Sequence, residues 1–257
     1  YPLVKNNNLS QEIFTPKISL RSNLSDNMKN SSTTKNVDVN NIFSINRLGI
    51  TDSFEAGKSL TLGFDYKLDF NENKSSKDKF LEFNLATVLR DKVENQIPES
   101  STIDKKMSNI FGSIQNNLFE NINMGYNFSI DNDLKTFESH EISTEVSINN
   151  FITTFYYNEK EGKLGSDHVI SNKTSYILDE NNSFSFSTSR NKEISLTEYY
   201  NFSYEYKNDC LTAGIKYNKT FYQDNDLVPS ENLFFTITLI PLTTYERILY
   251  ERDAYGN

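Results

Sequence analysis

The sequence of 257 residues is poor in the side chains that build metal sites and disulfide frameworks. It contains one cysteine, Cys210, two histidines, His140 and His168, and no tryptophan. A single cysteine cannot close a disulfide within the chain, and one cysteine with two histidines offers no credible zinc or iron site. We therefore expect no metal and no other cofactor.

Long apolar runs and an excess of basic residues are also missing. No stretch approaches 18 consecutive apolar residues, which excludes a membrane-spanning helix. Lysine and arginine number 26 against 35 aspartates and glutamates, and the net charge is −9. This negative balance argues against nucleic acid as a partner.

Patterns typical of enzymes are absent as well. The sequence has no glycine-rich phosphate loop, and neither histidine has a plausible nucleophile near it. Glu141 and Glu145 would share a strand face, but residues four apart on a strand are separated by about 13 Å, beyond the distances that glycosidases use. A solvated face explains this pair better, and we expect the protein not to be an enzyme.

Aromatic residues, in contrast, are abundant, and they recur at alternate positions. They make up 13% of the chain, which excludes plain disorder for most of its length. Period-two alternation indicates a strand with one apolar and one polar face. It is clearest at 122–130 and also occurs at 60–70, 200–207, 211–221 and 233–239, and more weakly at 12–22, 79–90, 109–118, 137–149, 151–160, 167–178 and 182–192. We predict an all-β antiparallel meander of about 11–12 strands.

Strand length and loop size favour a transmembrane barrel of the outer-membrane type. Most expected strands have roughly 9–13 residues, whereas strands of soluble proteins usually have about 5–6 and a tilted bilayer crossing takes about 9–11. Tight polar turns at 131–133, 179–182 and 208–209 alternate with longer polar segments at 23–40, 71–78, 91–108 and 223–230, as in an outer-membrane meander. We assign residues 1–245 to the barrel and 246–257 to a C-terminal tail.

Alternation alone does not say which face is inside. In a membrane barrel the apolar faces meet lipid and the polar faces line a wet lumen, whereas in a soluble sandwich the apolar faces form the core. The long strands and the tyrosines and phenylalanines near strand ends favour the barrel. On this reading the lumen-facing side chains include Asn121, Asn123, Asn127, Glu205 and Lys207. Arg47 and Asp52 are candidates for pinning a lumen-facing loop, with a contact that the sequence does not assign.

Three blocks of sequence resemble one known family. They are NIFSINRLGITD (41–52) with EAG (55–57) and the following strand, NDCLTAGI (208–215), and FFTITLIPL (234–242). Together, in this order, they resemble the LPS-assembly protein LptD family, also called the organic solvent tolerance protein or OstA family. The resemblance implies the C-terminal half of a large barrel in the outer membrane of a Gram-negative bacterium. Since the chain opens at Tyr1 without a signal-peptide pattern, we interpret it as a mature chain or an excised fragment.

The resemblance also implies a function and partners. Barrels of this family deliver lipopolysaccharide to the outer leaflet through a lumen and a lateral gate between the first and last strands. The implied partners are an LptE-like lipoprotein plug, the periplasmic Lpt bridge, reached through an N-terminal domain that this chain lacks, lipopolysaccharide itself and outer-membrane lipid.

The family implies roles for the last strand and for the cysteine. The last strand would be 232–242, with Leu233, Phe235, Ile237, Leu239 and Pro241 at the gate. Pro241 has no backbone N–H and would weaken the seam, although it could simply end the strand. Cys210 would pair with a cysteine of the N-terminal domain, which an oxidising periplasm permits; the alternative is a buried free thiol. The family often has two adjacent cysteines here, whereas this chain has one.

Two other functions stay open at this stage. One is a general outer-membrane porin or receptor barrel, which would have to close alone on an even number of strands. The other is a secreted soluble β-protein that binds carbohydrate with its aromatic faces.

Overall fold

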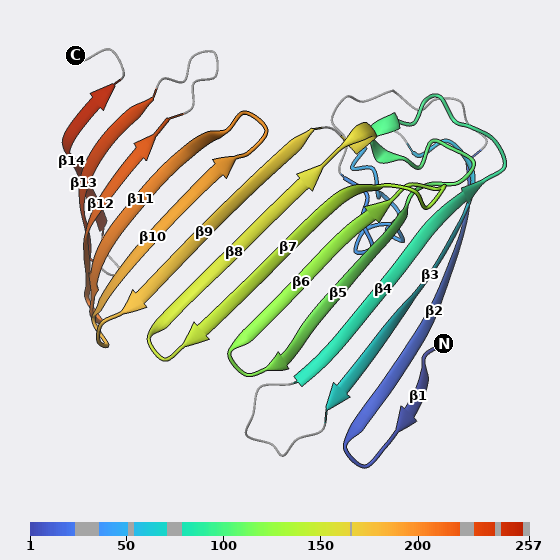
Figure 1. The fold of residues 1–257 in the computed structure, drawn as a ribbon, viewed down its shortest axis with the longest axis horizontal. Coiled ribbons are helices and arrows are strands. Elements are labelled where there is room, and N and C mark those ends of the chain that lie inside the picture. Colours follow the sequence, from blue (N-terminus) through green and yellow to red (C-terminus); the bar gives the residue numbers. More distant parts are fainter. Residues whose placement is uncertain are drawn as a thin grey trace. The chain divides into compact units, whose positions relative to one another are not determined.

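A computed structural model describes residues 1–23, 36–50, 54–70, 79–164, 166–221, 229–239 and 243–253. Fourteen strands form one antiparallel sheet in which each strand lies beside its neighbours in the sequence (Figure 1). The only helical turns in this part of the chain are two short 3₁₀ segments, η1 (Glu99–Ser101) and η2 (Gly162–Leu164). None of the helices in the ranges above has the length and apolar composition to cross a membrane. The predicted all-β antiparallel meander is confirmed.

Twelve of the strands match the expected ones, and two were not predicted. The full set is β1 (Leu3–Asn6), β2 (Ser10–Asn23), β3 (Gly57–Phe70), β4 (Lys79–Arg90), β5 (Ile110–Phe119), β6 (Ile122–Ile130), β7 (Phe137–Ile148), β8 (Phe151–Lys160), β9 (Asp167–Ile177), β10 (Asn182–Asn191), β11 (Leu196–Lys207), β12 (Leu211–Thr220), β13 (Ser230–Leu239) and β14 (Thr243–Asp253). The additions are β1 and β14. The predicted count of 11–12 is therefore too low.

The presence of β14 corrects two expectations. The segment 246–257 was expected to be a tail, but β14 occupies Thr243–Asp253. The strand at 232–242 was expected to be the last, but β13 pairs with β12 on one side and β14 on the other. The alternation fails in β14 because Ile248, Leu249 and Tyr250 are consecutive apolar residues. The β13–β14 register shifts between Leu233 and Phe234, as at a bulge, which moves side chains to the other face.

The chain folds into two compact units. Unit 1 comprises Tyr1–Ile142 and Asn158–Asp167, and unit 2 comprises Ser143–Tyr157 and His168–Asn257.

In unit 1 the apolar face of the sheet is exposed. β2 pairs with β3 over its whole length, with Leu20 opposite Leu60 and Ile18 opposite Leu62. The Ile18 side chain is 70% exposed and that of Leu20 is 79% exposed. The apolar residues that alternation places on one face of β2 and β3 thus do not pack into a core.

The buried apolar cluster of unit 1 lies on the opposite, polar face. Ala86 and Val88 of β4 and Phe111 of β5 belong to this cluster, and they share a face with Thr61 of β3 and Ser129 of β6 by strand pairing. The other members come from the connections between strands: Val37, Ile42, Leu48, Ile50, Ala56, Ile97 and Ile103. Two long connections therefore cover the polar face of unit 1, and no member of the buried cluster among the described residues lies on the apolar face.

The sheet of unit 2 also has one apolar face and one polar face. Phe186 of β10 lies opposite Phe202 of β11, and the Phe202 side chain is 46% exposed. On the other face the hydroxyls of Ser185 and Ser203 are 2.7 Å apart, and Asn201 donates to Ser187 at 3.4 Å. Aromatic side chains line one face and hydrogen-bonded polar side chains line the other.

Candidate functional site

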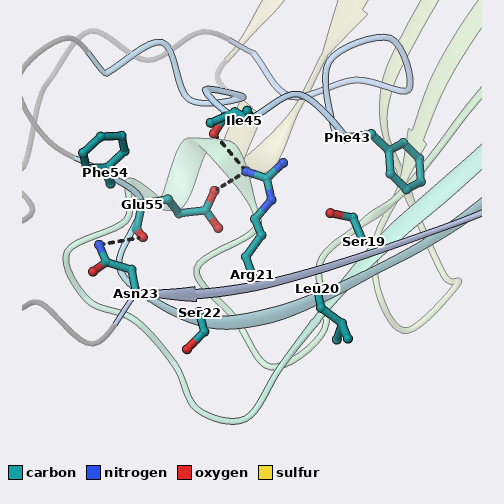
Figure 2. Close-up of a pocket in the computed structure, with 9 residues that line it drawn as sticks. All are labelled: Ser19, Leu20, Arg21, Ser22, Asn23, Phe43, Ile45, Phe54 and Glu55. Carbon is teal, nitrogen blue, oxygen red and sulfur yellow. Dashed lines mark hydrogen bonds and ion pairs between the residues drawn. The ribbon is translucent and has the colours of Figure 1, made fainter.

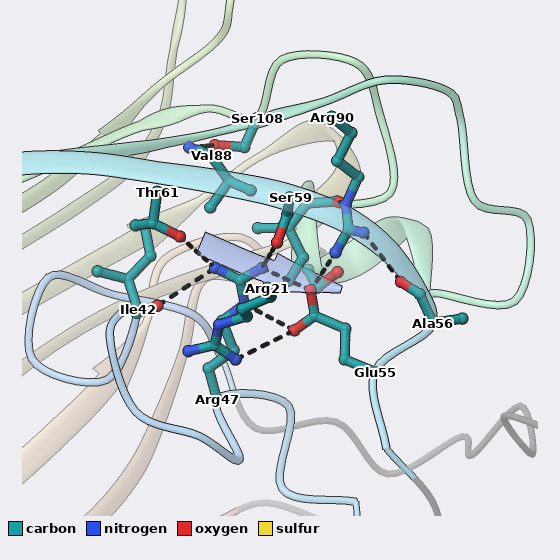
Figure 3. A network of polar contacts seen from close by, with 12 residues as sticks. Arg21, Ile42, Arg47, Glu55, Ala56, Ser59, Thr61, Val88, Arg90 and Ser108 are labelled. Atoms are coloured by element: carbon teal, nitrogen blue, oxygen red, sulfur yellow. Dashed lines mark hydrogen bonds and ion pairs between the residues drawn. The ribbon is translucent and has the colours of Figure 1, made fainter. Parts of the chain in front are cut away.

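A buried ionic cluster joins the two long connections to the polar face of unit 1. It consists of Arg21 at the end of β2, Arg90 at the end of β4, and Arg47 and Glu55 from the connection between β2 and β3 (Figure 3). We refer to these four residues as the arginine–glutamate cluster.

Arg47 lies at the centre of the arginine–glutamate cluster and is fully buried. Its guanidinium binds Glu55 with two hydrogen bonds, of which Nε donates to Oε2 at 2.7 Å. The remaining donors reach the Ile42 carbonyl at 3.2 Å, Thr61 Oγ1 at 2.9 Å and Ser59 Oγ at 3.2 Å. The paired hydrogen bonds between Arg47 and Glu55 are among the strongest arrangements available to two charged side chains. Through Thr61 and Ser59, the Arg47 side chain also holds the segment between β2 and β3 against β3.

Arg90 connects the same carboxylate to the other long connection. It donates to Glu55 Oε1, to the Ala56 carbonyl at 3.0 Å and to the Ile103 carbonyl. Nearby, the Val88 amide donates to Ser108 Oγ at 2.9 Å. The end of β4 is thus bound both to the 54–56 segment and to the 91–109 connection.

Arg21 completes the cluster from β2. Its guanidinium donates to the Ser44 carbonyl and, at 3.1 Å, to the Ile45 carbonyl. Its Nη1 lies 3.6 Å from Glu55 Oε2. The carboxylate of Glu55 therefore contacts Arg21 of β2 and Arg90 of β4 directly. It is linked to β3 through Arg47, which donates to Ser59 and Thr61.

The electrostatics keep Glu55 ionised. Burial alone would raise the pKa of Glu55, but the hydrogen bond and charge of Arg47, followed by the charges of Arg90 and Arg21, outweigh it. The pKa of Glu55 consequently lies below its ordinary value, as expected for a carboxylate with several cationic neighbours.

Gly57 makes the turn from the cluster into β3. It has φ +80°, in the left-handed region that favours glycine, and an added Cβ would collide with the side chain of Glu94. The spacing of Glu55 and Gly57 in the sequence thus has a structural reason: the carboxylate enters the cluster and the chain then turns directly into the strand.

These contacts suit a structural clasp better than a catalytic centre. Both oxygens of Glu55 accept hydrogen bonds from guanidinium groups, so neither is open for proton transfer to a substrate. Within the described ranges, no group of three or more His, Cys, Asp or Glu side chains could hold a metal ion. The contact that the sequence left unassigned for Arg47 is now defined, whereas Asp52 lies outside the described residues.

A cavity of about 470 Å³ lies next to the cluster, along β2 (Figure 2). Residues of both faces of β2 line it, with no residue of β3, so it lies along the edge of β2 away from β3. Its lining is Ser19, Leu20, Arg21, Ser22, Asn23, Phe43, Ile45, Phe54 and Glu55. A guanidinium and a carboxylate face this cavity beside large apolar side chains.

The five residues that we expected to face the lumen lie on two strands and in one turn. Asn127 is on the polar face of β6, where it donates to Glu141 at 3.4 Å, and Asn123 is an exposed residue of the same strand. Asn121 lies in the turn between β5 and β6 and not within a strand. Glu205 and Lys207 share the face of β11 that carries Ser203 and pair with Gly214 and Thr212.

The expected gate residues lie on β13. Leu233, Phe235, Ile237 and Leu239 alternate along it and pair with residues of β12 from Tyr217 to Leu211. Because β13 has a neighbour on both sides, these four residues are not on the last strand. Pro241 lies outside the described residues.

Cys210 occupies the tight turn between β11 and β12. The thiol is free and exposed, and the backbone N–H of Cys210 donates to Asn208 Oδ1 at 3.0 Å. The alternative of a buried thiol is therefore wrong. By the order of the strands, this turn is at the same strand ends as the tight turns at 120–121 and 149–150.

Sequence reasoning singled out Arg47 but missed Arg21 and Arg90 as its neighbours. Both are charged residues at polar positions near the end of an alternating strand, which is the signal that could have found them. A comparison of the sequence with models of protein families gave no match, and a comparison with curated proteins gave none either.

Proposed function

We propose that this chain forms the C-terminal half of an LptD-like outer-membrane β-barrel that delivers lipopolysaccharide to the outer leaflet. The observation that carries the proposal is the inverted arrangement of the sheet faces. Apolar side chains such as Ile18 and Phe202 are exposed along strands of 9 to 14 residues, and the packed cluster is on the polar face. A sheet of this kind is suited to lipid on one side and a wet interior on the other.

The lipopolysaccharide assignment depends on the sequence blocks that resemble the family. The first block, at 41–57, includes Arg47, Glu55 and Gly57, which hold the connection onto the polar face. The block that resembles the family therefore includes residues with a defined structural task in this chain.

In this proposal the polar face lines the conduit. Asn127, Glu205 and Lys207 would hydrate the saccharide part of the lipid and contact an LptE-like plug. The acyl chains would leave through a lateral seam beside the last strand, which we now assign to β14 instead of β13.

Cys210 has a position that suits its proposed disulfide. Short turns of outer-membrane barrels face the periplasm, whereas the long loops face outward. An exposed thiol in the short turn 208–210 would then be reachable by a cysteine of a periplasmic domain. The oxidising periplasm would allow the bond to form.

The two other functions fit the structure less well. A soluble carbohydrate-binding β-protein would bury its apolar faces, yet Leu20 and Phe202 are exposed. A porin would have to close alone, whereas the order of the described strands runs from β1 to β14 with no pairing between these two strands.

The experiment that tests the proposal is photo-crosslinking in the native outer membrane. A crosslinker at Tyr245 of β14 in the full-length protein should capture lipopolysaccharide, and depletion of the LptE-like partner should abolish the capture. The same crosslinker at Ile215 of β12 is the matched control, because both side chains are exposed while β12 is an inner strand. Capture of phospholipid alone at both positions, with conduction of small ions, would favour the porin.

A further inference from the structure

A row of charged side chains crosses one end of the apolar face of unit 2, on the neighbouring strands β12, β13 and β14 (Figure 1). Lys219 of β12 and Arg252 of β14 both lie opposite Glu231 of β13. Lys219 also lies opposite Tyr200 of β11, and residues directly opposite in an antiparallel pair share a face. The three charged residues, which we call the rim row, are therefore on the same face as the aromatic side chain of Tyr200.

The rim row lies at the strand ends that the long connection 221–229 joins. β12 ends at Thr220 and β13 begins at Ser230, each one residue from the row. Long loops of outer-membrane barrels face outward, and aromatic side chains near strand ends mark the level of the lipid headgroups. On the lipid face that we propose, the rim row therefore lies at the depth of the outer-leaflet headgroups, where basic side chains can bind anionic lipid.

The two cations of the rim row share one carboxylate. Oε2 of Glu231 lies 3.4 Å from Nζ of Lys219, and Oε1 accepts a hydrogen bond from the Tyr217 hydroxyl at 2.9 Å. The charge of Arg252 also acts on Glu231, but within the described ranges the Arg252 guanidinium forms no ion pair. Its hydrogen-bond donors are therefore available to an anion from outside the chain.

The other described carboxylates at these strand ends belong to the polar face. Glu251 lies opposite Asn232, and because adjacent residues of a strand point to opposite faces, its side chain is on the other side of the sheet from Arg252. Glu198 of β11 accepts a hydrogen bond from Ser189 at 2.6 Å, and Ser189 is on the polar face with Ser187 by the alternation of β10. Neither carboxylate neutralises the rim row.

A cavity of about 240 Å³ opens beside the rim row. Lys219, Glu231 and Arg252 line it, together with Phe221 and the Ser230 residue that begins β13. The Lys219 ammonium lies 5.4 Å from the centre of the Phe221 ring. The cavity therefore offers an ammonium, a guanidinium and a hydroxyl beside an aromatic wall, which suits a doubly charged anion attached to an apolar molecule.

We propose that Lys219 and Arg252 bind a phosphate group of lipopolysaccharide at the outer rim of the lipid face. The inference rests on the proposed function, because the depth of the site and the identity of the lipid follow from it. Arginine binds two phosphate oxygens in a fork, and lysine adds a point charge. The saccharide phosphate is then held beside β13 while the acyl chains contact the aromatic face below. Glu231 opposes this binding through its like charge and so limits the affinity.

Lipopolysaccharide with and without its phosphate groups tests this proposal on the full-length protein in detergent micelles. Native mass spectrometry measures the binding of the intact lipid, of the chemically dephosphorylated lipid and of phosphatidylglycerol, and the displacement of the intact lipid by inorganic phosphate. We expect the intact lipid to bind about fivefold more tightly than the dephosphorylated one, because it alone presents doubly charged phosphates. Phosphatidylglycerol, with one negative charge, should bind more weakly than the intact lipid, and an equimolar amount of inorganic phosphate should not displace it.

Variants of the rim row locate the site. Arg252→Gln and Lys219→Gln should each weaken the binding of the intact lipid about threefold, and Arg252→Lys, which keeps the charge, should restore part of the loss. Glu231→Gln should strengthen binding, because it removes the like charge. Arg247→Gln is the matched control: Arg247 lies on the same face of β14, opposite Phe235, about 13 Å along β13 from Glu231, and its loss should leave the phosphate preference unchanged.

Four results would overturn the proposal. They are equal binding of the intact and dephosphorylated lipids, equal losses in Arg247→Gln and Arg252→Gln, weaker binding in Glu231→Gln, and binding of phosphatidylglycerol or inorganic phosphate as tight as that of lipopolysaccharide. The folded fraction of each variant, followed by heat-modifiable migration on gels, separates a loss of binding from a loss of folding.

The outcome is separable from that of the proposed function. Capture of lipopolysaccharide at Tyr245 in the native membrane, without a phosphate preference that depends on Arg252, would reject this inference alone. A phosphate preference that depends on Arg252, without capture at Tyr245, would reject the transport function and leave the phosphate site in place.

Discussion

Arg47 and Glu55 form a two-point ion pair on the polar face of the sheet, with the guanidinium fully buried and Nε 2.7 Å from Oε2. They are only eight residues apart in the sequence. Through Arg21 and Arg90, however, the pair links the ends of β2 and β4 to the connection between β2 and β3. The pair therefore determines how the long connections lie on the face that we propose to line the conduit.

Replacing Glu55 should destabilise unit 1 strongly. Glu55→Gln leaves three guanidinium groups facing one another, and breaking a buried ion pair by removing one partner costs about 3–5 kcal/mol. Protease cleavage within 36–50 of the protein in outer-membrane vesicles should become much faster. Glu180→Gln, in the exposed turn between β9 and β10, is the control. Equal cleavage rates for the two variants would contradict the clasp.

Acid should loosen the same connection. The pKa of Glu55 is lowered in the folded protein, so its ionised form contributes stability that is fully present above the ordinary value of about 4.5 and is lost as the pH falls through the lower folded pKa. Protease protection of 36–50 should fall steeply below pH 4.5 in the native protein. The Glu55→Gln variant should lack the part of this dependence that comes from Glu55. An unchanged pH profile in the variant would assign the transition to other carboxylates.

Gly57 should tolerate no side chain. Gly57→Ala places a Cβ at φ +80° and against Glu94, and we expect a loss of about 1–3 kcal/mol from backbone strain. Thermal unfolding of the detergent-solubilised protein, followed by circular dichroism, measures the loss. Gly125→Ala on β6, where φ is not positive, should cost less. A larger loss for Gly125→Ala would argue against the turn as the reason for Gly57.

Cys210 should react readily when reduced. Because the thiol is exposed in the turn, a membrane-impermeant maleimide should label it in the periplasm of cells treated with a reductant. In untreated cells, a disulfide to the N-terminal domain should block labelling, and Cys210→Ser should remove the corresponding species from non-reducing gels. Full labelling of the untreated protein would show that the disulfide does not form.

Charge should be tolerated on one face of β11 and not on the other. Phe202→Arg places a cation on the proposed lipid face, where Arg costs about 2–4 kcal/mol at the bilayer midplane, so we expect less folded protein in the outer membrane. Ser203→Arg changes the adjacent residue on the polar face and should assemble nearly normally. Heat-modifiable migration on gels measures the folded fraction. The reverse order would place the lipid on the other face.

The strands could be predicted from the sequence because alternation is a local property. Each of β2 to β13 shows its period within about ten residues. β1 has only four residues, Leu3–Asn6, which are too few to show a period. β14 escaped prediction because the Ile248–Tyr250 run and the register shift break the alternation.

The arginine–glutamate cluster could not be predicted in the same way. Arg21 and Arg90 lie 34 and 35 residues from Glu55 on either side, and only the pairing of β2, β3 and β4 brings them together. The sequence showed that Arg47 was a charged residue in a polar segment. It could not show which side chains would surround it, because that depends on strand register.

The central claim is that the aromatic faces contact lipid and the polar faces contact water. Nitroxide labels placed one at a time along β11, at 200–205, in outer-membrane vesicles test it most directly. We predict that labels at Tyr200, Phe202 and Tyr204 relax mainly with oxygen, which concentrates in lipid, and that labels at Asn201, Ser203 and Glu205 relax mainly with a water-soluble nickel complex. Equal access of the nickel complex to all six positions would contradict the account, because it would place both faces of the strand in water.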